Sequence, residues 1–318
     1  MKERIYVFDN VKVWLMIMVV LGHTIIASYG STNVAVSYIW FFRGIYTMPL
    51  FFFYFRILYK NGGVNIRKLC KAVLLPFLVF NTVYMLYEPI VNENFSENWL
   101  IPGFSMWFLC VLFVYRLIFP LLIKIKYVLY LSIIVALLVG FIPWVGSVLA
   151  LSRLFCFLPF YLLGYYVNNE QMFSKVKYKI ISPFGLKDAF FLVGIVLVWA
   201  LILYYKPALA FLTTFNSSYG GNWLLLSVRL LMYLTAFAIG FYVLKLFPNR
   251  KTFYTKYGSR TMGVYLFHGL VVLPFAYNIF PPFEEGGILE NILMIGLPVV
   301  ICLFLFSKPV DVIVKKCF

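Results

Sequence analysis

Only two histidines occur in this chain, and one of them shares a predicted helix with a lysine. Lys12 and His23 are eleven residues apart in the stretch VFDNVKVWLMIMVVLGHT. On an α-helix this spacing gives roughly 16 Å of rise and puts both side chains on nearly the same face. A neutral imidazole can take a proton from a hydroxyl group, and an ammonium group attracts anions. The pair could serve such chemistry, or it could be a lysine that reaches the headgroups and a histidine bonded to a neighbouring helix.

The chain around this pair has the composition of a membrane protein. Of its 318 residues, 64% are apolar, 21% are aromatic and only 12% are charged, whereas an ordinary globular protein carries roughly a quarter charged residues. Repeated apolar runs of about 20 residues predict transmembrane helices. We therefore expect an all-α, polytopic membrane protein with about ten transmembrane helices, forming a single domain over residues 1–318. The predicted spans are residues 11–29, 38–58, 69–88, 104–123, 127–146, 152–168, 187–205, 222–246, 261–280 and 288–306.

The charges between these spans predict the orientation of the chain. Basic loops alternate with loops that are acidic, such as YEPIVNENFSENW and FEEGGILE, or that carry a single lysine. The positive-inside rule places the basic loops and both termini in the cytoplasm, and the expected location is a bacterial cytoplasmic membrane. The net charge of +16 then reflects topology and attraction to membrane lipid, and no nucleic-acid partner is expected. The residues assigned to the cytoplasm are Lys2, Arg4, Lys60, Arg67, Lys68, Lys71, Lys124, Lys126, Lys175, Lys177, Lys179, Lys245, Arg250, Lys251, Lys256, Lys308, Lys315 and Lys316.

Several other ionisable side chains lie inside the predicted helices, where they are unfavourable and commonly face the bundle interior. His268 is expected at a depth where it can meet His23, with a structural hydrogen bond and a chemical role both open. An interior Arg153 could hold a phosphate or carboxylate with its planar guanidinium group. Arg116 is expected to be a topology residue or to contact a cytoplasmic anion, and Arg43 to reach the lipid headgroups. The remaining residues of this kind are Arg56 and Arg229.

No motif for a different chemistry accompanies these residues. The five cysteines are scattered singly, so neither a disulfide framework nor a zinc site is expected, and no metal is predicted. The sequence contains no phosphate-binding loop and no serine-nucleophile elbow. No feature of the sequence specifies an oligomeric state.

Segments along the whole chain resemble one family of membrane enzymes. The opening FDNVKVWLMIMVVLGH, with ten residues between Lys12 and His23, is similar to that of the acyltransferase-3 family of integral-membrane O-acyltransferases, especially its fucose 4-O-acetylase-like acetyltransferase branch. Further matches are MPLFFF at 48–53, MWFLCVLFVYRL at 106–117, LSRLFCFLPFYLLGYY at 151–166 and GSRTMGVYLFH at 258–268. About ten spans with both termini inside is also the layout of this family.

The resemblance implies transfer of an acyl group, usually acetyl from acetyl-CoA, to a sugar hydroxyl of a surface glycan or its lipid-linked precursor. His23 is then assigned the role of general base, with an acyl-histidine intermediate as the alternative. Lys12 would attract the phosphates of CoA or orient the thioester, and Asp9 would hold Lys12 in place. The predicted substrate-binding residues are Arg153, Asp9, His268 and Arg116.

One segment departs from the family pattern. The family usually has a small residue where this chain has Arg56, and often has histidine where it has Thr47. A bulky cation next to the site would alter the acceptor pocket or impair activity.

Two other functions stay open. A transporter or flippase for a glycan or glycolipid would also need a polar site near the midplane. A non-catalytic scaffold in a polysaccharide-export complex is the third alternative.

Overall fold

The computed structural model describes residues 5–57, 65–95, 98–167, 182, 184–216, 218–283 and 285–318. All regular secondary structure within these ranges is helical, which confirms the predicted fold class. Six of the cations assigned to cytoplasmic loops lie outside the described residues, namely Lys2, Arg4, Lys60, Lys175, Lys177 and Lys179.

The helices follow the apolar runs of the sequence, with short helical turns between them. The first half of the chain contains α1 (Tyr6–Thr24), η1 (Ile26–Ser28), α2 (Val34–Ile57), α3 (Ile66–Leu69), η2 (Cys70–Leu74), α4 (Leu75–Val91), α5 (Trp107–Leu122), α6 (Val128–Leu138) and η3 (Val139–Phe141). The second half contains η4 (Val148–Ala150), α7 (Leu151–Cys156), α8 (Leu158–Val167), α10 (Leu186–Tyr205), η5 (Pro207–Thr214), α11 (Leu224–Leu246), η6 (Thr255–Ser259), α12 (Thr261–Pro274), η7 (Phe275–Ile279), α13 (Ile288–Leu305) and α14 (Lys308–Cys317).

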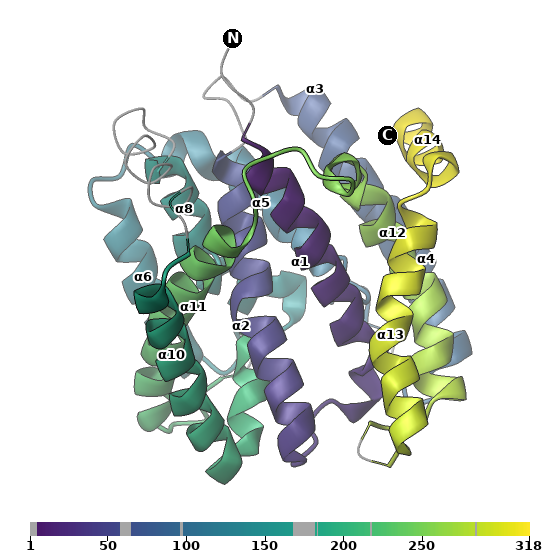
Figure 1. The fold of residues 1–318 in the computed structure, drawn as a ribbon. Helices are drawn as coiled ribbons and strands as arrows, with labels where there is room; N and C mark the ends of the chain where they lie inside the picture. The colour runs from purple at the N-terminus through teal and green to yellow at the C-terminus, as the bar shows by residue number, and fades with distance from the viewer. Residues whose placement is uncertain are drawn as a thin grey trace.

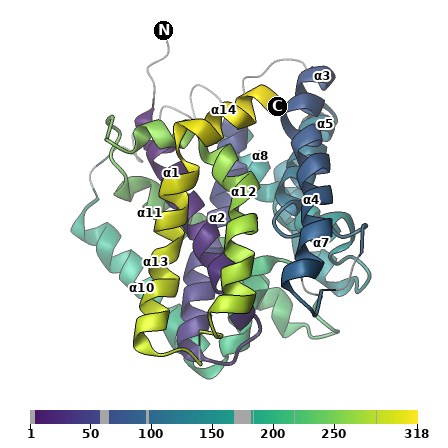
Figure 2. The same ribbon diagram turned by 90° about the vertical axis from the view of Figure 1, so that its right-hand side faces the viewer.

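α1, which carries Lys12 and His23, lies between α2 and α13 (Figures 1 and 2). It packs against α2, α12 and α13 along its length, and η6 covers its first turns. The start of α1, α3 and α14 lie at the same end of the bundle (Figure 1). The described chain therefore begins and ends at the same end of the bundle.

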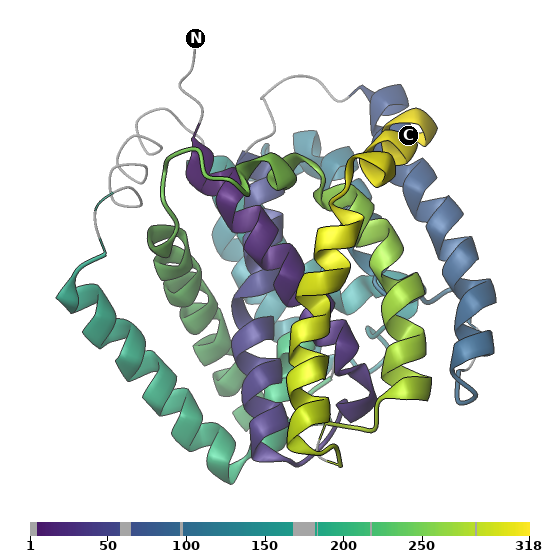
Figure 3. The same ribbon diagram turned by 45° about the vertical axis from the view of Figure 1, so that its right-hand side comes forward.

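Seven helical segments of the described chain are long and apolar enough to cross a membrane, which confirms a polytopic membrane protein. An eighth span results if the η4–α7 segment and α8, which meet at a bend of 46°, are counted together. α5 and the α6–η3 segment are apolar but shorter, so ten crossings remain a prediction. Of α10, at the edge of the bundle (Figure 3), only Trp199 and Leu203 are buried. Many of its other apolar side chains, such as Phe190 and Leu197, are exposed and available to lipid.

The chain between α6 and α8 is broken at the segment GFIPWVGSVLALSR. η3 ends at Phe141, just before Pro143, so this span is shorter than the predicted 127–146. Proline removes a backbone donor and disfavours helix in the residue before it. Leu149 and Ala150 then adopt φ angles of 48° and 54°, which L-residues rarely do. α7 therefore enters the bundle as a short separate helix, and it carries Arg153.

η5 and α14 are two of the helical elements that lie outside the predicted spans. η5 occupies a segment expected to be a loop and packs against α2. α14 follows the last predicted span, and its Asp311 and Lys315 form an ion pair of 2.7 Å. Both elements are far shorter than the apolar run of about 20 residues that predicts a span, so hydropathy does not reveal them.

α2 and α8 approach each other closely at Gly164. A Cβ atom there would lie 2.3 Å from the backbone oxygen of Phe53, so the two helix backbones would have to separate. We expect Gly164→Ala to lower the free energy of unfolding by roughly 1–3 kcal/mol, as overpacked cores do. Gly194→Ala on α10 is the matched control, because a Cβ atom at Gly194 meets nothing within 4 Å. Equal melting temperatures of the two variants in detergent would contradict this prediction.

Candidate active site

The first turns of α1 are held by a loop from the other end of the chain. Asn10 is fully buried, and its amide nitrogen donates hydrogen bonds to the carbonyl oxygens of Pro248 and Arg250 at 2.8 and 3.1 Å. Its oxygen accepts a hydrogen bond from Thr255 at 2.7 Å. These bonds place η6 beside Lys12. This role of Asn10 was not predictable from the sequence, because an asparagine near a helix start is more often a surface cap.

Lys12 borders a cavity of about 310 Å³ between α1, α2, η2, α5 and α12. Lys12 Nζ lies 2.9 Å from Asp9 Oδ1, which is the ion pair that the sequence predicts. Arg116 of α5 lines the same cavity, so the fold brings two predicted binding residues together. From Lys12 the cavity follows α1 past Met16 to Val19.

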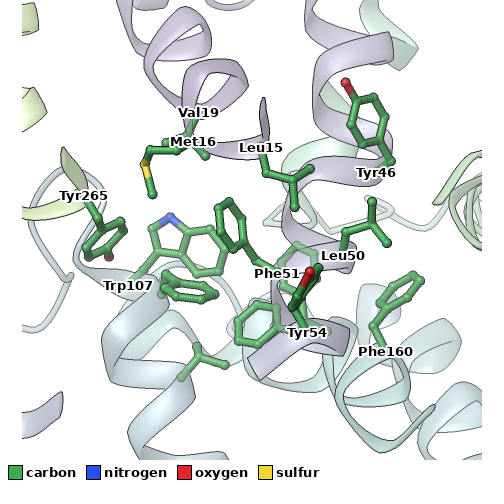
Figure 4. Close-up of a cluster of buried hydrophobic side chains, with 14 of the residues drawn as sticks. Leu15, Met16, Val19, Tyr46, Leu50, Phe51, Tyr54, Trp107, Phe160 and Tyr265 are labelled. Atoms are coloured by element: carbon green, nitrogen blue, oxygen red, sulfur yellow. The ribbon is translucent and has the colours of Figure 1, made fainter. Parts of the chain in front are cut away.

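The inner end of the cavity is formed by residues that lie one helical turn from each histidine. Val19 precedes His23 on α1 by four residues, and Tyr265 precedes His268 on α12 by three; both line the cavity. Both side chains belong to the cluster of buried hydrophobic side chains drawn in Figure 4. Since one turn rises about 5.4 Å, the cavity leads from the first turns of α1 toward the two histidines.

His23 and His268 meet in the interior, as their predicted depths indicate. Their ring centroids are 5.3 Å apart, and the Phe104 ring lies 4.3 Å from His23 and 5.3 Å from His268. His268 is fully buried, and its Nδ1 is 2.9 Å from the backbone oxygen of Val264 and 2.8 Å from that of Tyr265. These acceptors indicate that Nδ1 carries the proton and that Nε2 presents a lone pair.

This pair is suited to general base catalysis. His23 is partly exposed whereas His268 is fully buried, so His23 is the ring that a substrate can reach. Nδ1 of His23 and Nε2 of His268 have no hydrogen-bond partner within the described ranges. Buried polar atoms without a partner are unfavourable. A polar ligand bound beside the rings would supply the missing hydrogen bonds.

Arg43 lies beside His23, and the prediction that it reaches the lipid headgroups is wrong. A Cβ atom on Gly22 would be 2.0 Å from Nη1 of Arg43, so the guanidinium group occupies the space left by that glycine. Its Cζ lies 4.5 Å from the centroid of the Trp40 ring. α2 begins at Val34 rather than at residue 38, and Arg43 is therefore roughly 14 Å from the start of its helix, too deep for a headgroup contact.

Arg153 has an interior position, as required for it to bind an anion. Its Cζ lies 4.5 Å from the centroid of a Trp107 ring, and its Nε donates a hydrogen bond of 3.2 Å to the carbonyl oxygen of Thr214. The side chain remains partly exposed. Arg153 does not line the Lys12 cavity. Of the predicted binding residues, Asp9 and Arg116 thus lie with Lys12, while Arg153 and His268 lie at the level of His23.

Arg56 is not next to the site, contrary to the prediction. It is fully buried, with Cζ 4.0 Å from the centroid of the Phe119 ring and 4.8 Å from that of the Tyr165 ring. Its neighbour Phe55 lines the Lys12 cavity, but the next residue of a helix points about 100° away, and Arg56 therefore faces α5 and α8. Arg56 does not line the Lys12 cavity.

Arg229, the remaining ionisable residue of the predicted spans, and Tyr46 have packing roles. Arg229 is buried, with its Cζ 4.5 Å from the centroid of the Tyr219 ring and its Nη1 donating to the carbonyl oxygen of Ala136 at 3.4 Å. Tyr46 accepts a hydrogen bond of 3.0 Å from Trp14 Nε1. Neither side chain lines the Lys12 cavity.

The structure offers no cluster of metal ligands in the part of the chain that it describes. No three His, Cys, Asp or Glu side chains gather there, and all five cysteines are free.

The family of the chain follows from comparison with known proteins. The model of the acyltransferase-3 family, described as an acyltransferase domain, matches residues 5–307. This range contains both histidines and every helix from α1 to α13. No curated protein and no solved structure matches the chain. Because the family match covers nearly the whole chain, the protein belongs to the acyltransferase-3 family of membrane acyltransferases.

Proposed function

We propose that the protein transfers an acetyl or other short acyl group from acyl-CoA to a sugar hydroxyl of a surface glycan or a lipid-linked glycan precursor, as in the fucose 4-O-acetylase-like branch. The observation that supports this best is the cavity that runs along α1 from Lys12 to one turn short of His23. We place the protein in a bacterial cytoplasmic membrane with the Lys12 end of the cavity toward the cytoplasm, where CoA thioesters are found.

The cavity suits the shape and charge of an acyl-CoA. Lys12 and Arg116 would bind its phosphates, with Asp9 holding Lys12 in position. The rise of roughly 16 Å between Lys12 and His23 suits the pantetheine arm that joins these phosphates to the thioester. The wall of the cavity is mostly apolar, with Met16, Phe51 and Leu109 among its residues. A thioester carried in this way would arrive beside the two histidines.

The transfer step then needs a base at His23. The hydroxyl oxygen of the acceptor attacks the carbonyl carbon of the thioester, and His23 takes the hydroxyl proton. The C–S bond breaks as the tetrahedral intermediate collapses, and the imidazolium returns the proton to the departing thiolate. The products are the sugar ester and free CoA. His268, with its free Nε2, would orient the hydroxyl or the His23 ring. An acyl-histidine intermediate is the alternative route.

The experiment that tests the function follows free thiol release from acetyl-CoA by purified protein in proteoliposomes. Thiol release that depends on an added glycan extract supports transfer to a glycan. Movement of labelled glycan across the vesicle membrane without thiol release would point to a transporter. Neither activity from folded protein would point to a scaffold.

Lys12→Gln is expected to raise the KM for acetyl-CoA about tenfold, because a charge-assisted contact to phosphate is lost. Arg116→Gln should act in the same direction. If Lys12 orients the thioester instead, kcat falls and KM changes little. Lys315→Gln is the matched control, since its side chain is 65% exposed on α14 at the same end of the bundle. Unchanged kinetics for both Lys12→Gln and Arg116→Gln would refute the assignment of this cavity to the donor.

A further inference from the structure

Two arginines beside His23 are held by tryptophan rings rather than by carboxylates. The Cζ atoms of Arg43 and Arg153 each lie 4.5 Å from a ring centroid, that of Trp40 and that of Trp107 respectively. Within the described residues, no carboxylate is at ion-pair distance from either guanidinium group. A cation–π contact uses the face of the guanidinium plane and leaves the N–H donors at its edge available.

These donors are largely unused by the protein. The guanidinium group of Arg43 forms no hydrogen bond to the described part of the chain, and its Nε is buried. The hydrogen bond from Arg153 Nε to Thr214 is the one bond of this guanidinium to the residues described. Ionisable groups inside membrane proteins are unfavourable unless they are paired. Two such cations without a counter-ion among the described residues point to a place where an anion can bind.

The two arginines belong to one cluster with His23. Arg153 forms a hydrogen bond to Thr214 of η5. The preceding residue, Thr213, packs tightly against α2, since a Cβ atom placed on Gly44 would lie 2.5 Å from Oγ1 of Thr213. Gly44 follows Arg43, whose guanidinium group lies against Gly22, next to His23. Both guanidinium charges also act electrostatically on His23. An anion held by this cluster would lie beside the proposed base.

This cluster is separate from the donor cavity. Neither Arg43 nor Arg153 lines that cavity, and the cluster lies roughly 16 Å along α1 from Lys12. Both side chains are partly exposed. Tyr29, whose ring centroid is 5.3 Å from that of Trp40, is 52% exposed. A molecule can therefore approach the cluster without passing through the donor cavity.

We propose that Arg43 and Arg153 bind an anionic group of the acceptor, so that the protein acts on an acidic glycan that carries a carboxylate or a phosphate. The planar donor fork of arginine matches both groups in bidentate geometry. This inference rests on the proposed acyl transfer only in naming the bound anion as part of the acceptor. The anion site itself can be tested without any acyl donor.

The test is calorimetric titration of the full-length protein in detergent with three methyl glycosides. They are methyl glucuronide, methyl glucoside 6-phosphate and the neutral methyl glucoside. We expect at least one acidic glycoside to bind about tenfold or more tightly than the neutral one. Arg43→Gln and Arg153→Gln should each remove most of this preference, and Arg43→Lys should keep part of it. Lys206→Gln, which removes an exposed cation next to η5, should keep it fully.

Each outcome has a defined meaning. Preference for the glucuronide identifies a carboxylate-bearing acceptor, and preference for the phosphate identifies a phosphate-bearing one. Equal binding of all three glycosides, no binding of the acidic ones, or a preference that survives both glutamine substitutions in folded protein would overturn the proposal. If those substitutions lower turnover on acidic and neutral acceptors alike, with binding unchanged, the arginines stabilise the oxyanion instead. Intact acidic preference without thiol release would refute acyl transfer but retain the anion site.

Discussion

His23→Ala is expected to lower acyl transfer by about 10²- to 10⁴-fold, the usual contribution of a positioned general base. The variant should fold, because the side chain is only partly buried and its Nδ1 has no hydrogen-bond partner in the described chain. Thiol release at saturating acetyl-CoA is the measurement, since the loss should appear in kcat with little change in KM. A melting curve equal to that of the unsubstituted protein would show that the loss is chemical.

A second variant, His268→Ala, distinguishes the role of His268 from that of His23. His268 is fully buried and bonded through Nδ1 to its own helix, so its removal should lower stability as well as turnover. If His23→Ala retains turnover close to that of the unsubstituted protein while His268→Ala loses it, His268 is the base and the assignment is wrong. A burst of thiol release without any acceptor, abolished by His23→Ala, would indicate an acyl-histidine intermediate.

Most of the helical architecture could be predicted, because a helix that crosses a bilayer needs an apolar run long enough to match the thickness of the bilayer. The break before α7 was predictable for a similar reason, since Pro143 ends a helix through its missing donor. The positions of η5 and α14 were not, because neither segment is long enough to span a membrane. η5 nevertheless matters for the site, since its Thr214 carbonyl holds Arg153.

The site was predictable where one helix determines the geometry. Lys12 and His23 share α1, so their spacing alone fixes their relative position, and the Asp9–Lys12 ion pair follows in the same way. Arg43 and Arg56 depend on how α2 is rotated against its neighbours. A helix that is apolar on all sides gives no periodic signal for that rotation, and small residues that allow close approach decide it instead. Gly22 and Gly164 are two such residues.

Gly22→Ala is expected to lower acyl transfer by about 10- to 100-fold without loss of stability, because a displacement of about 1 Å near a reacting group can have such an effect. The new methyl group would lie 2.0 Å from Nη1 of Arg43 and 2.2 Å from its Cζ. A guanidinium group is the far end of a flexible side chain, so Arg43 moves and the helices stay in place. Alanine is also the better helix former by roughly 1 kcal/mol.

The matched control is Gly296→Ala on α13, where a Cβ atom meets nothing within 4 Å. It carries the same gain in helix propensity and should leave transfer unchanged. A double-mutant cycle then tests the cause. If Gly22→Ala lowers transfer by displacing Arg43, the double variant Gly22→Ala/Arg43→Gln should transfer at the same rate as Arg43→Gln alone. Additive losses would show that Gly22 acts by another route, such as rotation of the neighbouring His23.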